Sequence, residues 1–152
     1  MIKNLSHVDL TEKILGCAIT VHKELGPGFL EKIYEHALCI EFDHHGISYH
    51  RQKPMPITYR KKQCGFHQFD LVVENKIIIE LKATSGFDDI HFATVLSYLK
   101  ASSLPVALLL NYAKPILAIR RFGNSFIKTG NPGTQENLGN TLKIFHEDPF
   151  AT

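Results

Sequence analysis

The residues of this chain that are best suited to chemistry are two acids and a lysine: Asp70, Glu80 and Lys82. They fall within two short runs of apolar and β-branched residues separated by Glu74-Asn75, a pattern typical of a β-hairpin. If the loop holds three residues, Asp70 lies opposite Glu80, and Lys82 shares the face of Glu80. Two opposed carboxylates repel each other, so a divalent cation with oxygen ligands is the simplest compensation.

A second register of this hairpin stays open. With a two-residue turn, Asp70 would face Ile79, and all three charged side chains would be ordinary surface residues. In the first register the gathered acids suit Mg²⁺ or Mn²⁺, which prefer hard oxygen ligands. Lys82 beside two carboxylates stays protonated there, so it acts by charge and positioning rather than as a free base.

The helices that must position these residues can be outlined from hydrophobic spacing. Residues Val8 to Leu25 carry apolar side chains at three- and four-residue intervals and predict a helix that Gly26-Pro27-Gly28 ends. A second helix is expected from about Phe29 to His44, with Gly46 as its stop. Asp88 to Ser102 shows the same kind of spacing and predicts a third helix.

The expected strands are short apolar runs bounded by turn residues: 47–59, 65–73, 76–83, 105–110 and 115–120. Pro54 and Pro56 confine the first of them to a sheet edge or a bulged position. The third helix separates the third and fourth strands. This order favours an α/β fold, with a central mixed β-sheet flanked by helices, over separate α and β domains.

Length and composition are those of one globular domain. The 152 residues are 44% hydrophobic and 21% charged, which argues against global disorder. We expect the folded domain to span residues 1–122. From Gly123 onward the composition shifts to small and polar residues, which is typical of a loosely ordered C-terminal tail at 123–152.

Nothing in the sequence indicates secretion or a membrane. The longest apolar run, Pro105 to Leu110, is far shorter than the roughly 20 residues of a membrane span. The first residues lack the apolar core of a signal peptide. The three cysteines form no disulfide framework, and neither they nor the nine histidines are spaced as a zinc motif. A cytoplasmic protein is therefore expected, and a homodimer is the base-rate oligomer.

Charge is unevenly distributed along the chain. The net charge is only +2, yet residues 51–62 contain five basic side chains and no acidic one. Such a stretch suits the phosphates of a nucleic acid, and a solvated hairpin edge with lysines is an equally ordinary explanation. The sequence leaves both alternatives open.

Two motifs resemble known families. Asp70, nine intervening residues and Glu80-Leu81-Lys82 resemble the D-x(n)-E-x-K core of the PD-(D/E)XK nuclease superfamily. The segment Gly28-Phe29-Leu30-Glu31-Lys32-Ile33-Tyr34 matches the G-x-x-E-x-x-Y signature of a small bacterial and archaeal family, the GxxExxY proteins, placed in that superfamily. The resemblance covers roughly Leu5 to Arg121. It implies a restriction-endonuclease-like core and metal-dependent hydrolysis of phosphodiester bonds in DNA or RNA.

The resemblance also implies roles for individual residues. In nucleases of this superfamily the Asp and the Glu of the core ligate Mg²⁺, which assigns the cation, or Mn²⁺, to Asp70 and Glu80. The backbone carbonyl of Leu81 would lie beside the metal, and Lys82 would position or activate the attacking water. Several members add a carboxylate from the first core helix, and Glu31 matches that position.

Four further residues are expected to contact nucleic acid. Tyr34 lies one turn beyond Glu31 on the same helix face, although an aromatic residue at helical spacing is also typical of a core. Tyr98 belongs to a Tyr98-Leu99-Lys100 stretch that resembles the same family. Arg51 and Lys53 are basic and would meet the phosphate backbone, with affinity that falls as salt rises.

One position departs from the family pattern. Many relatives carry a glutamine in a Q-x-x-x-Y arrangement on the helix after the core, and here Thr94 stands where that glutamine would fall. Threonine is shorter and has no amide. His91 faces the same way and is the alternative donor, or an ordinary capping residue. The departure motivates a second hypothesis, a non-catalytic module that binds nucleic acid or protein and retains the nuclease fold.

Overall fold

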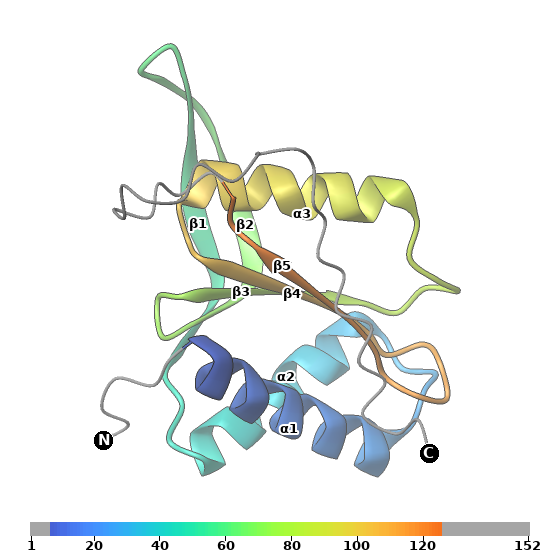
Figure 1. Cartoon of the computed structure of the whole chain (residues 1–152). Coiled ribbons are helices and arrows are strands. Elements are labelled where there is room, and N and C mark those ends of the chain that lie inside the picture. The colour runs from blue at the N-terminus through green and yellow to red at the C-terminus, as the bar shows by residue number, and fades with distance from the viewer. Residues whose placement is uncertain (1–6, 126–152) are drawn as a thin grey trace, which may run out of the picture.

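The computed structural model describes residues 7–125, so the predicted tail at 123–152 lies almost entirely outside the described residues. Three helices and five strands follow one another nearly as the hydrophobic spacing predicts, and Figure 1 shows their arrangement. Their bounds are α1 His7–Leu25, α2 Glu31–His44, β1 Tyr49–Tyr59, β2 Lys62–Val73, β3 Ile77–Lys82, α3 Asp89–Ser102, β4 Val106–Asn111 and β5 Ala118–Gly123.

The five strands form one mixed sheet in the order β1-β2-β3-β4-β5. Neighbouring strands are antiparallel except β3 and β4, which are parallel. A parallel pair needs a long crossover, and α3 supplies it between β3 and β4. The expected α/β fold with a central mixed sheet flanked by helices is confirmed.

Helices cover both faces of this sheet (Figure 1): α1 and α2 lie on one face and α3 lies on the other. The strand β3 serves both layers because its side chains alternate. Ile77, Ile79 and Leu81 belong to the apolar cluster with α1 and α2. Ile78 belongs to the cluster with α3, so alternation directs Glu80 to that same side. Within residues 7–125, no helix has the length and apolar character that a membrane crossing requires.

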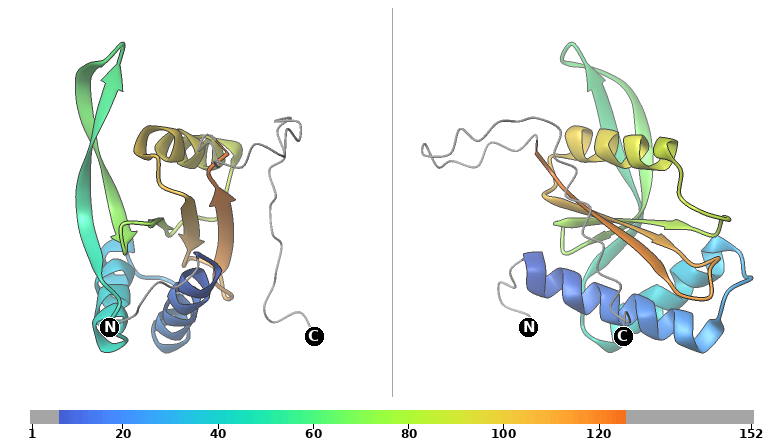
Figure 2. Two further views of the ribbon diagram at one scale, coloured as in Figure 1. Left: turned by 60° about the vertical axis from the view of Figure 1, so that its left-hand side comes forward. Right: turned by 45° about the vertical axis from the view of Figure 1, so that its right-hand side comes forward.

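The strand with two prolines is an edge strand, as predicted. β1 is the first strand of the sheet, and its pairing with β2 shifts between Ile57 and Thr58. Pairing of β1 with β2 continues to Tyr59 and Lys62, whereas pairing of β2 with β3 ends at Leu71. The two strands therefore run on together as a twisted ribbon beyond the rest of the sheet (Figure 2).

The hairpin between β2 and β3 has the three-residue loop. Val73 pairs with Ile77, and Leu71 pairs with Ile79. Glu74 and Asn75 both adopt left-handed backbone conformations with φ of 52°, and the Lys76 N–H donates to the Val73 carbonyl at 2.9 Å. The alternative two-residue turn, which would pair Asp70 with Ile79, is wrong because Ile79 pairs with Leu71.

Candidate active site

Asp70 and Glu80 meet where β2 and β3 separate. The paired ladder ends at Leu71 and Ile79, one residue short of these two acids. The Asp70 N–H donates to Oε1 of Glu80 at 3.3 Å, and the Leu81 N–H donates to Oδ2 of Asp70 at 2.9 Å. Carboxylates thus replace backbone carbonyls as the hydrogen-bond acceptors at this fork. The fork gathers both acids beside the Leu81 backbone.

Burial and charge together set the protonation of Glu80. Its side chain is only 7% exposed. Burial, and then the Asp70 carboxylate, raise the pKa of Glu80 from 4.5 to about 8, while the Lys82 ammonium opposes the rise. Ionising both of these neighbouring carboxyl groups costs free energy when no cation is present. Their oxygens fit a hard divalent cation, whose charge would let both groups ionise.

Lys82 is the last residue of β3 and is half-buried. Its positive charge acts on Glu80, since it lowers the pKa of that carboxyl. The Lys82 carbonyl accepts a 2.9 Å hydrogen bond from the Tyr112 N–H, which holds the end of the strand in place. Lys82 therefore supplies a cationic group next to Glu80, on a strand end that the backbone hydrogen bond holds in place.

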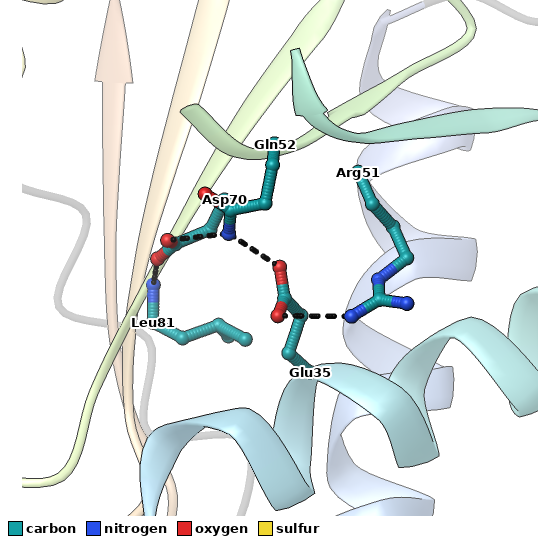
Figure 3. A network of polar contacts seen from close by, with 5 residues as sticks. All are labelled: Glu35, Arg51, Gln52, Asp70 and Leu81. Carbon is teal, nitrogen blue, oxygen red and sulfur yellow. Dashed lines mark hydrogen bonds and ion pairs between the residues drawn. The ribbon is translucent and has the colours of Figure 1, made fainter. Parts of the chain in front are cut away.

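A third acid, Glu35, is connected to Asp70 through Gln52 (Figure 3). Glu35 lies on α2 and is only 3% exposed. The Gln52 side-chain amide donates to Oε1 of Glu35 at 2.8 Å and to Oδ1 of Asp70 at 3.4 Å. Arg51 lies 3.4 Å from the other oxygen of Glu35. Hydrogen bonds from Gln52 and Leu81 thus orient both oxygens of Asp70.

Gln52 holds this position with an unusual backbone. Its neighbours Arg51 and Lys53 pair with Leu71 and Phe69, so Gln52 falls opposite Asp70 in the register. Its φ is 50°, a left-handed conformation that costs a non-glycine residue about 1–2 kcal/mol. Strand alternation predicts an extended residue here, and no sequence signal for the left-handed conformation is present. The hydrogen bonds to two acids offset the strain.

Glu31 does not enter the site in the way we expected. A carboxylate that joins Asp70 and Glu80 on a metal would have to leave solvent, whereas the Glu31 side chain is exposed at the first residue of α2. Its Oε1 accepts a long 3.4 Å hydrogen bond from the Ala83 N–H, just after the end of β3. The buried position one turn further along α2 belongs to Glu35. A metal-ligand role of Glu31 therefore stays a proposal.

Tyr34 is a core residue, and the prediction that it contacts nucleic acid is wrong. Its side chain is fully buried. The hydroxyl donates to the Gly26 carbonyl at 2.6 Å and accepts from the Phe29 N–H at 3.2 Å. The ring stacks on Tyr112 with a centroid distance of 4.3 Å. Tyr34 ties the α1–α2 connection to the core, which leaves no face for a ligand.

Tyr98 lies on α3, the helix that covers the Glu80 side of the sheet. Its ring is half-buried and stacks on His67 at a centroid distance of 4.2 Å. Burial raises the pKa of Tyr98, and the negative charges of Glu80 and Asp70 raise it further. The phenol therefore stays neutral at ordinary pH and is a hydrogen-bond donor near the acids.

The two basic residues predicted to bind nucleic acid already have partners within the protein. Arg51 is exposed and forms an ion pair with buried Glu35. Lys53 donates to the Asn75 side-chain carbonyl at 3.1 Å, across the β2–β3 loop. Both lie on the edge strand β1, so a phosphate that approaches this edge would meet them from the solvent side.

Neither Thr94 nor His91 on α3 replaces the glutamine that many relatives carry. Thr94 is half-buried in the middle of α3. The Nδ1 atom of His91 lies 3.1 Å from Oδ1 of Asp88 and 3.4 Å from its backbone nitrogen, in a capping box at the start of α3. His91 is thus the capping residue that the sequence offered as an alternative.

Among residues 7–125, the set of three ligating side chains whose atoms come within 4.8 Å of one another is Cys17, Glu41 and His45. These residues lie on α1 and at the end of α2. In the part of the chain that the structure describes, Glu31, Asp70 and Glu80 do not converge to that distance.

Comparison with known proteins agrees with this geometry. A family model described as the PD-(D/E)XK nuclease superfamily matches residues 8–122, which spans all five strands and three helices apart from their outermost residues. A search of curated proteins and a search of solved structures gave no match. The matched segment contains the fork of Asp70 and Glu80, together with Lys82 and Glu35. The chain therefore belongs to the PD-(D/E)XK nuclease superfamily.

Proposed function

We propose that this protein is a metal-dependent nuclease of the GxxExxY type that hydrolyses phosphodiester bonds in DNA or RNA, with residues 1–122 as its nuclease domain. The observation that carries the proposal is the fork of β2 and β3. There Asp70 and Glu80 hydrogen-bond through the Asp70 N–H, in a chain of the nuclease superfamily. Lys82 lies near enough to influence the pKa of Glu80.

The donor set that would hold a cation consists of oxygens. Asp70, Glu80 and the Leu81 carbonyl are the proposed ligands, with Glu31 as a further carboxylate near the end of β3. Oxygen donors suit Mg²⁺ or Mn²⁺. Such a cation, when bound, polarises the phosphoryl oxygen and lowers the pKa of a coordinated water.

The protein's own residues have distinct tasks in this proposal. Gln52 and Leu81 keep the Asp70 carboxylate in one orientation, which is the preorganisation that catalysis requires. The Lys82 ammonium positions water and stabilises the negative charge that develops on the phosphoryl group. Tyr98 donates a hydrogen bond from its neutral phenol, and Arg51 and Lys53 contact the phosphate backbone.

Incubation of the purified protein with single-stranded, duplex and branched DNA and RNA, in Mg²⁺ or Mn²⁺, tests this function. We expect cleavage of at least one substrate, its loss with EDTA, and its loss in Asp70→Ala, Glu80→Ala and Lys82→Ala. Glu24→Gln, which changes an exposed acid on α1, is the matched control and should cleave normally. Cleavage that survives all three alanine variants would contradict the proposal.

A non-catalytic binding module is the second candidate. Thr94, which stands where many relatives have a glutamine, favours this function. Three exposed apolar side chains around Glu31 also favour it, namely Phe29, Leu30 and Ile33. An apolar patch of this kind is typical of a protein-binding surface. Fluorescence anisotropy with the same nucleic acids separates the two functions. Binding in the absence of cleavage under every metal condition supports the module.

A further inference from the structure

A second cluster of ligating side chains joins α1 to the end of α2. Cys17 lies on α1 and is only 4% exposed. Glu41 lies on α2, and His45 caps that helix. One ligand atom from each residue lies within 4.8 Å of the other two. None of these residues takes part in the Asp70–Glu80 site.

The separation between Glu41 and His45 in this cluster is the one that tetrahedral zinc imposes. Bonds of about 2.1 Å from zinc to nitrogen and oxygen place those two atoms about 3.4 Å apart. Nε2 of His45 and Oε2 of Glu41 are 3.4 Å apart. A sulfur ligand at about 2.3 Å would lie about 3.6 Å from the nitrogen. The side chain of His45 is 54% exposed, so it has room to rotate, and its ligand atom already lies within 4.8 Å of the Cys17 sulfur.

The donor types separate this cluster from the nuclease site. A thiolate, an imidazole and a carboxylate suit zinc, whereas Mg²⁺ prefers oxygen ligands alone. Ten residues of helix separate Glu35 from His45, which is about 15 Å along the axis. We propose that Cys17, Glu41 and His45 form a zinc site that fastens α1 to α2, with water as the fourth ligand.

Cobalt substitution tests this proposal with a signal that nuclease activity does not influence. The full chain, reduced with a phosphine, is titrated with Co²⁺ and followed by absorption. We expect one equivalent of Co²⁺ to produce a thiolate-to-cobalt charge-transfer band and tetrahedral visible bands, and Zn²⁺ to displace them. Cys17→Ser should abolish the charge-transfer band, and His45→Gln should weaken Co²⁺ binding at least tenfold. Asp70→Asn should retain both the charge-transfer band and the affinity for Co²⁺.

Matched variants keep the result interpretable. Cys64→Ser and His44→Gln change an exposed cysteine and the neighbouring histidine, and both should keep the full cobalt spectrum. If Cys17→Ser fails to fold, His45→Gln and Glu41→Gln decide, because these side chains are not buried. The absence of a charge-transfer band in the wild type would overturn the proposal, as would a band that persists without His45 and Glu41. The Glu41–His45 contact would then be an ordinary ion pair within the helix.

Discussion

The Leu81 N–H donates a 2.9 Å hydrogen bond to Oδ2 of Asp70, across the point where β2 and β3 stop pairing. In a regular ladder this N–H of β3 would donate to a backbone carbonyl of the neighbouring strand, and here it donates to a carboxylate instead. In the opposite direction, the Asp70 N–H donates to the Glu80 carboxyl group. The end of a strand ladder thus becomes the position of two acids, which is the basis of the proposed nuclease site.

Gln52 provides the first prediction. Gln52→Ala removes the donor to Glu35 and Asp70 but keeps the left-handed backbone. A buried acceptor on Glu35 loses its partner, which should lower the free energy of unfolding by about 1–3 kcal/mol in urea denaturation. Gln52→Gly loses the same hydrogen bonds without the backbone strain, and should be about 1 kcal/mol more stable than Gln52→Ala. Equal stabilities would show that φ of Gln52 carries no strain.

Two glutamates one turn apart on α2 provide a matched comparison. Glu35→Gln replaces an acceptor that faces two donors, Gln52 and Arg51, and should cost about 2 kcal/mol of unfolding free energy. Glu31→Gln makes the same chemical change at an exposed position and should change stability by less than about 0.5 kcal/mol. Urea denaturation of both variants measures the difference. A larger cost for Glu31→Gln would mean that Glu31, and not Glu35, is the structural acid.

The raised pKa of Glu80 predicts a pH dependence of stability in metal-free protein. Folding raises this pKa from 4.5 to about 8, so the folded state holds a proton that the unfolded state releases. The contribution of protonated Glu80 to the free energy of unfolding is therefore complete below pH 4.5 and is lost as the pH rises through 8. The total loss is on the order of a few kcal/mol. Melting temperatures from pH 5 to 8.5 in EDTA should fall for the wild type.

Glu80→Gln is the control for this decline, since an amide does not titrate in that range. The variant should lose less stability than the wild type over the same pH interval. Parallel pH profiles of the two proteins would show that Glu80 ionises normally. The comparison isolates Glu80 because the other titrating groups, the histidines included, are shared by both proteins.

Most of the fold could be predicted because local signals agree with the global arrangement. Glycine and proline end the first helix as expected, and Pro54 and Pro56 lie on an edge strand. The three-residue loop at Glu74 and Asn75 determines the register, and that register brings Asp70 to Glu80. Short-range chemistry in one hairpin was enough to locate the central acids.

The parts that the sequence did not reveal depend on tertiary contacts. Glu31 and Glu35 lie one turn apart on the same helix, and the family motif points to Glu31, while the sheet buries Glu35. A left-handed Gln52 within a strand violates the alternation on which strand prediction relies. The spacing of Tyr34 is compatible with a ligand contact or with a core position, and its full burial on α2 against Tyr112 decides for the core.

Divalent metal should stabilise the protein, and more strongly at higher pH. Cation binding requires Glu80 to ionise, so each bound ion displaces a proton below pH 8. At a hundredfold excess over its dissociation constant, Mg²⁺ or Mn²⁺ should add about 2.7 kcal/mol to the stability. Titration calorimetry at pH 6 and pH 8 should show tighter Mn²⁺ binding at pH 8, and Asp70→Asn should remove it. Binding of equal strength at both pH values would contradict ionisation of Glu80 upon binding.

The most direct measurement is the cleavage rate of Asp70→Asn relative to the wild type, on the best substrate and with Mn²⁺ in excess. The variant keeps an oxygen that can accept the Leu81 N–H, removes the negative charge, and replaces the acceptor of the long 3.4 Å Gln52 hydrogen bond with an amide group. If Asp70 holds the catalytic cation, the single-turnover rate should fall by more than about 100-fold while the nucleic acid still binds. A rate within a few-fold of the wild type, in a correctly folded variant, would contradict the assignment of this fork as the nuclease site.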